Sequence, residues 1–158
     1  MAAKYAGWGI SGYIFLISIK DKDMGQISTV KYLGDLRTEA VHLESGDRIY
    51  TDAPKENEGK GDAFSPTDLV ATSLASCMIT VMGIKARQHN IDMNGATADV
   101  VKEMDANPRQ ISVIRINIHF PKNYTNKENI LLQRTAQTCP VGNSLNDNLE
   151  VDVSFYYP

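Results

Sequence analysis

The chain of 158 residues contains little cysteine and little surplus charge of either sign. Two cysteines, Cys77 and Cys139, are too few for a disulfide-rich secreted scaffold or an all-cysteine zinc or iron–sulfur site. A formal net charge of −3 argues against a surface that binds nucleic acid or an anionic membrane. Because His42, His89 and His119 lack metal-ligand spacing, we expect no metal and no cofactor.

A convincing targeting signal is also missing. The apolar run from Tyr13 to Ile19 follows a single lysine, Lys4, and is far shorter than the roughly 20 residues that span a bilayer. We therefore expect residues 1–26 to be an N-terminal extension, native or foreign to the protein. Residues 27–158 are expected to form one domain, located in the cytoplasm and without a membrane partner.

The chain does contain one long uncharged stretch, from Leu69 to Ile84, preceded by a strong helix-start signal. Ser65 is predicted to be the N-cap, Pro66 the first helical residue and Asp68 the capping-box acid. The helix is expected to run to about residue 88. Serine and threonine interrupt its apolar sequence, so we interpret it as a helix buried on nearly every face, against a sheet or a second subunit.

Alternation of apolar and polar residues predicts strands on both sides of this helix. The predicted strands cover residues 27–32, 36–43, 48–51, 96–104, 111–120 and 149–157. A second helix is predicted from Lys127 to about Thr138, capped by Asn126 and ended by Cys139-Pro140. A short helical turn is expected within residues 141–146. This order predicts an α+β domain with mainly antiparallel pairing.

Taken alone, the two cysteines are typical of packing residues. Cys77 lies in the middle of an apolar helix, where a free cysteine behaves as a small hydrophobic side chain. Cys139 lies at a helix end before a proline. Their separation of 62 positions excludes the CxxC arrangement of a thioredoxin-like pair.

Two segments around the cysteines form a more specific pattern. They are Phe64-Ser-Pro-Thr-Asp-Leu-Val-Ala-Thr-Ser-Leu-Ala-Ser-Cys77 and Cys139-Pro-Val-Gly-Asn-Ser-Leu145. Together with the order of elements, these segments resemble the OsmC/Ohr family of thiol-dependent peroxidases, in its divergent OsmC-like branch. The resemblance implies an OsmC/Ohr-like fold, with an antiparallel sheet packed around a long buried central helix. It also implies an intertwined homodimer in which each active site draws on both subunits.

The resemblance further implies reduction of an organic hydroperoxide substrate. Cys77 would be the peroxidatic cysteine that becomes a sulfenic acid, and Cys139 the resolving cysteine that forms a disulfide with it. An external dithiol reductant would then restore both thiols. Apolar residues near Cys77 on the helix would bind the alkyl part of the substrate. These residues are Leu74, Met78 and Val81.

A cation is needed to activate the attacking thiol. A free cysteine with a pKa of about 8.5 is mostly protonated at pH 7, and Cys77 lies about three turns from its helix start, too far for the dipole. The resemblance implies an arginine from an early strand, for which we choose Arg37, with Arg48 as the alternative. Cys139 is expected to be the less acidic thiol, because it follows a helix C-terminus.

The clearest departure from the family is Thr67, which stands where the family has the glutamate that orients this arginine. Asp68 or Glu58 could substitute for it. The departure favours an alternative function, that of a catalytically weak OsmC-like module which binds a small apolar or thiol ligand. In that case the cysteines would respond to redox conditions without efficient turnover.

Overall fold

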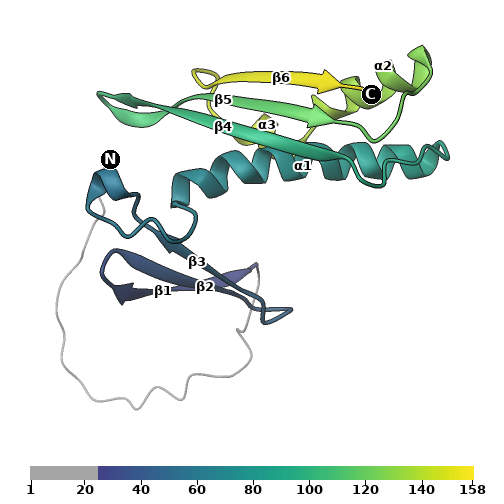
Figure 1. Ribbon diagram of the computed structural model, residues 1–158. Helices are drawn as coiled ribbons and strands as arrows, with labels where there is room; N and C mark the ends of the chain where they lie inside the picture. The colour runs from purple at the N-terminus through teal and green to yellow at the C-terminus, as the bar shows by residue number, and fades with distance from the viewer. Residues whose placement is uncertain (1–24) are drawn as a thin grey trace, which may run out of the picture.

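The computed structural model describes residues 25–158, so the N-terminal extension expected over residues 1–26 lies outside the described residues except for its last two. Figure 1 shows an α+β arrangement in which all the predicted strands and both main helices occur in the predicted order. The elements are β1 (Ser28–Gly34), β2 (Arg37–His42), β3 (Arg48–Asp52), η1 (Lys55–Asn57), α1 (Pro66–Gln88), β4 (Thr97–Ala106), β5 (Arg109–His119), α2 (Asn126–Ala136), α3 (Pro140–Ser144) and β6 (Glu150–Tyr156).

The described strands form two three-stranded sheets. The first sheet has the order β1-β2-β3, and both of its pairs are antiparallel. The second sheet has the order β4-β5-β6; β4 and β5 are antiparallel, whereas β5 and β6 are parallel. The chain returns from β5 through α2 and α3 before it enters β6, and a crossover of this length is what parallel pairing needs. Mainly antiparallel pairing is therefore confirmed, with one parallel pair that the sequence did not predict.

The start of α1 agrees with its prediction. The Asp68 backbone N–H donates to the Ser65 hydroxyl oxygen at 3.1 Å, and the Ser65 N–H donates to the Asp68 carboxylate at 2.7 Å. These two bonds form a capping box, and Pro66 occupies the first turn, where its missing N–H has no cost. The residue at which α1 begins is thus set by local sequence.

One face of α1 forms the core with the second sheet and α2. Its buried residues are Ala71, Leu74, Ala75, Met78, Met82 and Ala86, and they join Ile114, Ile116, Ile118, Phe120, Leu132 and Ala136. The opposite face is not covered, since Val70 and Ile84 are 37% and 53% exposed. Within the single chain the second sheet and α2 cover α1 from one side only, so burial of the helix on nearly every face, against a sheet or a second subunit, stays a prediction.

By length and hydropathy alone, α1 would also qualify as a membrane span, with a mean hydropathy of 1.6 over its most apolar window. Part of that hydropathy comes from Leu74, Met78 and Met82, and these three side chains pack in the core of the chain. In Figure 1 the second sheet lies on one side of α1, and the first sheet lies on the other side, near the start of the helix.

The second helix, α2, begins one residue earlier than predicted. Its cap is Thr125 rather than Asn126, because Thr125 has an acid three residues later to complete a capping box. The Thr125 N–H donates to the Glu128 carboxylate at 2.8 Å. After α2 ends at Ala136, the short helix α3 starts at Pro140, and Cys139, the residue immediately before it, is the N-cap of α3.

Candidate functional site

The fold brings the two cysteines together, although they are 62 positions apart in the sequence. Both are free thiols; Cys77 on α1 is partly buried, and Cys139 between α2 and α3 is 1% exposed. The Cys139 sulfur lies 4.0 Å from the carbonyl oxygen of Leu74, one turn before Cys77 on α1. The reactive positions predicted from the two motifs therefore share one small region at the centre of α1.

The Cys139 thiol is held in place by the start of α3. Its sulfur accepts a hydrogen bond from the Gly142 backbone N–H at 3.2 Å, as an N-cap side chain does. Burial is the largest effect on its pKa and raises it; the Gly142 N–H acts in the opposite direction, and an interaction with the Cys77 side chain raises the pKa again. The expected low acidity agrees with this direction, but its main cause is burial rather than the C-terminus of α2.

Two of the three residues expected to bind substrate are buried in the core of the single chain. Leu74 is 0% and Met78 5% exposed, because both point from α1 toward the second sheet. Val81 lies differently, on the wall of an open groove of about 690 Å³ between α1 and α2. The groove is lined by Val81, Ile84, Lys85, Gln88, His89, Lys127, Ile130, Leu131, Arg134, Thr135 and Thr138. The groove therefore combines apolar side chains with cations.

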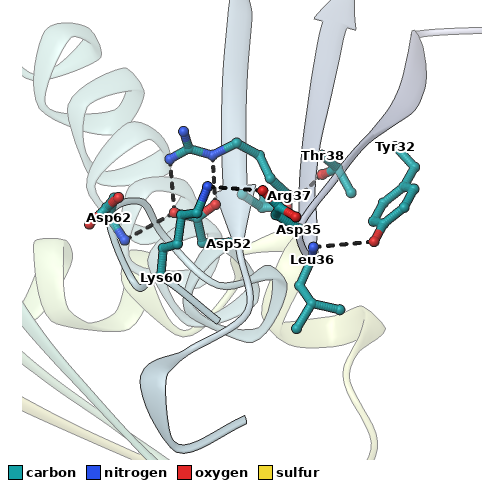
Figure 2. Close-up of polar contacts among 9 residues, drawn as sticks. Tyr32, Asp35, Leu36, Arg37, Thr38, Asp52, Lys60 and Asp62 are labelled. Atoms are coloured by element: carbon teal, nitrogen blue, oxygen red, sulfur yellow. Dashed lines mark hydrogen bonds and ion pairs between the residues drawn. The ribbon is translucent and has the colours of Figure 1, made fainter. Parts of the chain in front are cut away.

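Arg37 lies on β2 and is held by an acid on β3. Its Nε donates to Asp52 Oδ1 at 2.7 Å and its Nη2 donates to Asp52 Oδ2 at 2.8 Å, as Figure 2 shows. The two residues are direct cross-strand partners in the antiparallel register. The Asp52 side chain is 1% exposed and that of Arg37 is 33% exposed, so the carboxylate is enclosed while part of the guanidinium faces outward.

The pair is ionised throughout the physiological pH range. The hydrogen bonds between the two side chains raise the pKa of the Arg37 guanidinium. The same bonds lower the pKa of the Asp52 carboxyl, although burial acts in the opposite direction. A backbone N–H from Asp62 also donates to Asp52 Oδ2, at 3.0 Å, and contributes to the lower pKa.

Asp52 replaces the two acids that the sequence suggested as partners of Arg37. Asp68 is engaged elsewhere, in the cap of α1 and in an ion pair with Lys102 at 3.1 Å. Glu58 ends η1 with a positive φ of 64° and does not hold Arg37. The sequence contained one signal for Asp52, its position at the end of a strand that faces Arg37, but the register was needed to read it.

The other candidates near the first sheet and the start of α1 have their own partners. Arg48, the alternative arginine, donates to Glu39 at 2.9 Å and is 57% exposed. Glu39 also accepts a hydrogen bond from the Tyr50 hydroxyl at 2.9 Å. The Thr67 hydroxyl lies 3.0 Å from the hydroxyl of Ser65, so it takes part in the start of α1.

The arginine and the cysteines belong to different layers of the chain. Within residues 25–158, the hydrogen bonds and ion pairs of Arg37 lead to Asp52 and to neither cysteine. Figure 1 shows β2 in the first sheet, away from the second sheet and α3. The same described range contains no group of three or more histidine, cysteine, aspartate or glutamate side chains arranged to hold a metal ion.

An α+β fold that joins two free thiols from separate motifs defines a class of cysteine-based proteins. The chain matches the family model of the OsmC-like protein over residues 59–154, which is 96 of its 158 residues. It therefore belongs to the OsmC-like protein family, as the segments around the two cysteines predicted. No curated protein gives a significant match.

Solved structures agree with this assignment. A candidate osmotic stress induced and detoxification response protein from Psychrobacter arcticus 273-4 is 50% identical, with a TM-score of 0.81 over 83% of this chain and 96% of that one. The organic hydroperoxide resistance protein OsmC from Legionella pneumophila is 18% identical, with a TM-score of 0.67 over 85% and 99%. A candidate organic hydroperoxide resistance protein from Vibrio cholerae, with captopril in one active site, is 20% identical, with a TM-score of 0.63 over 86% and 95%. The last two similarities show the fold alone.

Proposed function

We propose that the protein is a cysteine-based peroxidase that reduces organic hydroperoxides. The observation that carries the proposal is the meeting of two free thiols, Cys77 partly exposed on α1 and Cys139 buried beside it. An attacking thiol needs access to substrate, whereas a resolving thiol needs only access to the first sulfur. Further support comes from fold relatives in Legionella pneumophila and Vibrio cholerae that are named organic hydroperoxide resistance proteins.

The reaction has three steps. The Cys77 thiolate attacks the terminal oxygen of R–O–O–H, the O–O bond breaks, and the alkoxide takes a proton to leave as R–OH. The resulting sulfenic acid condenses with the Cys139 thiol, forms a disulfide and releases water. An external dithiol then reduces that disulfide by exchange and is itself oxidised. A cytoplasmic location suits this cycle, because cytosolic reductants keep dithiols reduced.

A second copy of the chain would complete the site. The cation proposed to activate Cys77 is Arg37, which lies on β2 of the first sheet and whose hydrogen bonds lead to Asp52. The first sheet also carries an uncovered apolar face, with Val30, Tyr32 and Ile49 being 68%, 63% and 51% exposed. We infer a homodimer in which the first sheet packs on the partner and brings Arg37 toward the partner's thiols. Burial of these side chains would stabilise such a dimer.

The chemistry is tested by adding one equivalent of an alkyl hydroperoxide to the reduced protein, followed by intact mass and peptide mapping. We expect a disulfide between Cys77 and Cys139. In Cys139→Ser the sulfenic acid should persist and react with dimedone, whereas Cys77→Ser should consume no hydroperoxide. The proposal fails if neither a disulfide nor a sulfenic acid forms, or if Cys77→Ser consumes hydroperoxide at the wild-type rate.

The second candidate function is a catalytically weak module that binds a small apolar or anionic ligand. The observation in its favour is the groove of about 690 Å³ between α1 and α2, where Ile84 and Ile130 lie among Lys85, Lys127 and Arg134. Steady-state consumption of hydroperoxide with a dithiol reductant separates the two functions. Turnover no faster than that of a free thiol would favour the module.

A further inference from the structure

We propose that the open groove between α1 and α2 is a binding site for an amphipathic anion, that is, a ligand with a carboxylate head and an alkyl chain. The groove has a volume of about 690 Å³. Small-molecule sites are usually of this size, roughly 300–1,000 Å³. The inference goes beyond the proposed peroxidase chemistry and does not depend on it. It assigns a class of ligand to the groove that the second candidate function uses.

Two helix faces form the walls of the groove. The α1 wall runs from Val81 to His89, the α2 wall runs from Lys127 to Thr138, and both end just beyond their helices. In each wall the lining residues recur three and four positions apart, which is the spacing of a single helix face. The α1 wall is about 12 Å long at roughly 1.5 Å per residue, so an alkyl chain of medium length can lie along it.

Apolar side chains in the groove would hold the alkyl chain. Ile84 on α1 and Ile130 on α2 both line the groove, and they are 53% and 42% exposed. Val81 and Leu131, which line it as well, are partly buried. An alkyl chain in contact with these four residues would remove apolar surface from water, and this removal favours binding.

The charged side chains of the groove are all cations, namely Lys85, Lys127 and Arg134. None of the lining residues is an acid, although the chain as a whole has a formal net charge of −3. Within residues 25–158 these three cations form no ion pair with a carboxylate. Lys85 Nζ donates only to the side-chain oxygen of Gln88, at 3.5 Å. A carboxylate head in the groove would therefore give these cations a partner of opposite charge.

The first sheet of a second copy does not match this pattern of charge. The cross-strand rows on its uncovered face, which contain Val30 and Tyr32, include no acid. Its opposite face has Glu39 and Asp52, and both are already paired with arginines of their own sheet. Such a sheet would cover the isoleucines of the groove and leave its cations without a counterion. A small amphipathic anion satisfies both parts of the groove.

The groove lies beside the two thiols but does not include them. Val81 is one turn after Cys77 on α1, and Thr138 immediately precedes Cys139. Neither cysteine is among the residues that line the groove. Binding can therefore be measured in the reduced protein with no hydroperoxide present, and the result is independent of whether the protein is a peroxidase.

The test is calorimetric titration of the reduced protein with decanoate, below its micelle concentration. Decanol and decylammonium have the same chain with no charge and with the opposite charge. We expect decanoate to bind about tenfold or more tightly than decanol, and decylammonium to bind more weakly than either. Raising the ionic strength from about 0.05 to about 0.5 M should weaken the binding of decanoate and leave that of decanol nearly unchanged.

Charge variants show whether the cations of the groove cause this preference. The triple variant Lys85→Gln, Lys127→Gln and Arg134→Gln should lose about tenfold or more of the affinity for decanoate and little of the affinity for decanol. The matched control is the triple variant Lys31→Gln, Arg87→Gln and Arg109→Gln. It changes the net charge by the same amount at cations that form no ion pair within residues 25–158 and lie outside the groove. We expect the control to lose less than about twofold.

Apolar variants test the other half of the site. The double variant Ile84→Ser and Ile130→Ser should weaken the binding of decanoate and of decanol by similar factors, about tenfold, because both ligands have the same chain. Val101→Ser, at a valine that is 50% exposed on the second sheet, is the control and should change neither. These side chains are exposed in the chain, so the variants are expected to fold.

Other results would overturn the site. Equal affinities for decanoate and decanol would show a plain apolar groove, and equal losses in the two triple variants would show that net charge attracts the anion. Failure to bind decanoate would also overturn it; if the double serine variant then raised the dissociation constant of the inferred homodimer, a second copy would be the occupant. A protein that binds decanoate as expected but reduces no hydroperoxide keeps this site and loses the proposed peroxidase function.

Discussion

The two sheets of this chain differ in how far the rest of the chain covers their apolar side chains. In the second sheet, Ile114, Ile116 and Ile118 are fully buried, because α1 and α2 of the same chain cover them. In the first sheet, Val30 and Ile49 are both more than half exposed, although they lie in one cross-strand row with Ala40. The second sheet therefore has its core within the chain, while the first has an apolar face that nothing in the described residues covers. This difference is the observation on which the inferred homodimer rests.

Each face of the first sheet also has its own character. Residues Val30, Ala40 and Ile49 lie on one face, and Arg37 with Asp52 lies on the other, because neighbours along a strand alternate. The second sheet supplies packing for α1, which carries a thiol. The first supplies an oriented cation. Separating these two contributions experimentally is the way to test the comparison.

The largest expected effect is on stability, from a substitution in the second sheet, whose core lies within the chain. Ile116→Ala removes a side chain that is 0% exposed and should lower the free energy of unfolding by about 2–5 kcal/mol. Ile49→Ala, at 51% exposure, should cost under about 1 kcal/mol in dilute protein. Urea denaturation of both variants measures the difference. Equal losses at low protein concentration would contradict the comparison.

The next effect concerns association. Val30→Asp places a charge on the uncovered face and should raise the dissociation constant of the inferred homodimer by about tenfold or more, which is about 1.4 kcal/mol. The matched control is Val101→Asp on β4, where the valine is 50% exposed on the second sheet. Sedimentation equilibrium over a concentration series measures both. A monomeric wild-type protein, or equal effects of the two variants, would show that the apolar face is not the contact.

A smaller effect is expected at the start of α1, which connects the two halves. Ser65→Ala removes the hydroxyl that accepts the Asp68 N–H and should cost about 1 kcal/mol. Thr125→Ala at the start of α2 is the control, because it removes an equivalent cap within the second half alone. Hydrogen exchange should show the loss near residues 65–69 only in Ser65→Ala. Loss of protection throughout the first sheet would show that the cap couples the halves more strongly than expected.

The smallest effect on stability at neutral pH is expected from two groups with shifted pKa values, Asp52 in the first sheet and Cys139 beside α1. The folded pKa of Asp52 is lowered, chiefly by its bond to Arg37, so its stabilisation is complete above the ordinary pKa of about 4 and is lost as the pH falls through the lower folded value. The folded pKa of Cys139 is raised by burial, so unfolding becomes easier as the pH rises above about 8.5. Asp52→Asn should flatten the acid side of the stability profile and Cys139→Ser the alkaline side. Unchanged profiles would contradict both assignments.

The parts of the fold that could be predicted are those encoded locally. Ser65, Pro66 and Asp68 specify the start of α1 within four residues, and alternation specifies each strand. Asp52 could not be found this way, because its contact with Arg37, 15 positions earlier, depends on the register between two strands. The N-cap role of Cys139 was missed for a related reason. Only three residues separate the end of α2 from the start of α3, and the sequence does not show to which of the two helices Cys139 belongs.

The same limit applies to the candidate site. The two motifs predicted which cysteines matter, and the fold brings them together. Burial could not be predicted for Leu74 and Met78, because it depends on which face of α1 meets the second sheet. The open face of α1 has the same origin, since an uncharged helix sequence does not tell whether its cover comes from the same chain.

The cap of α3 has a consequence for the redox cycle. In the reduced chain the Cys139 sulfur serves the helix, because it accepts the Gly142 N–H at 3.2 Å. In the proposed cycle the same sulfur bonds to Cys77, with which it already interacts in the reduced chain, so the atom that caps α3 is also the atom that is oxidised. The cap of this five-residue helix would therefore change its chemistry with each oxidation and regain it with each reduction.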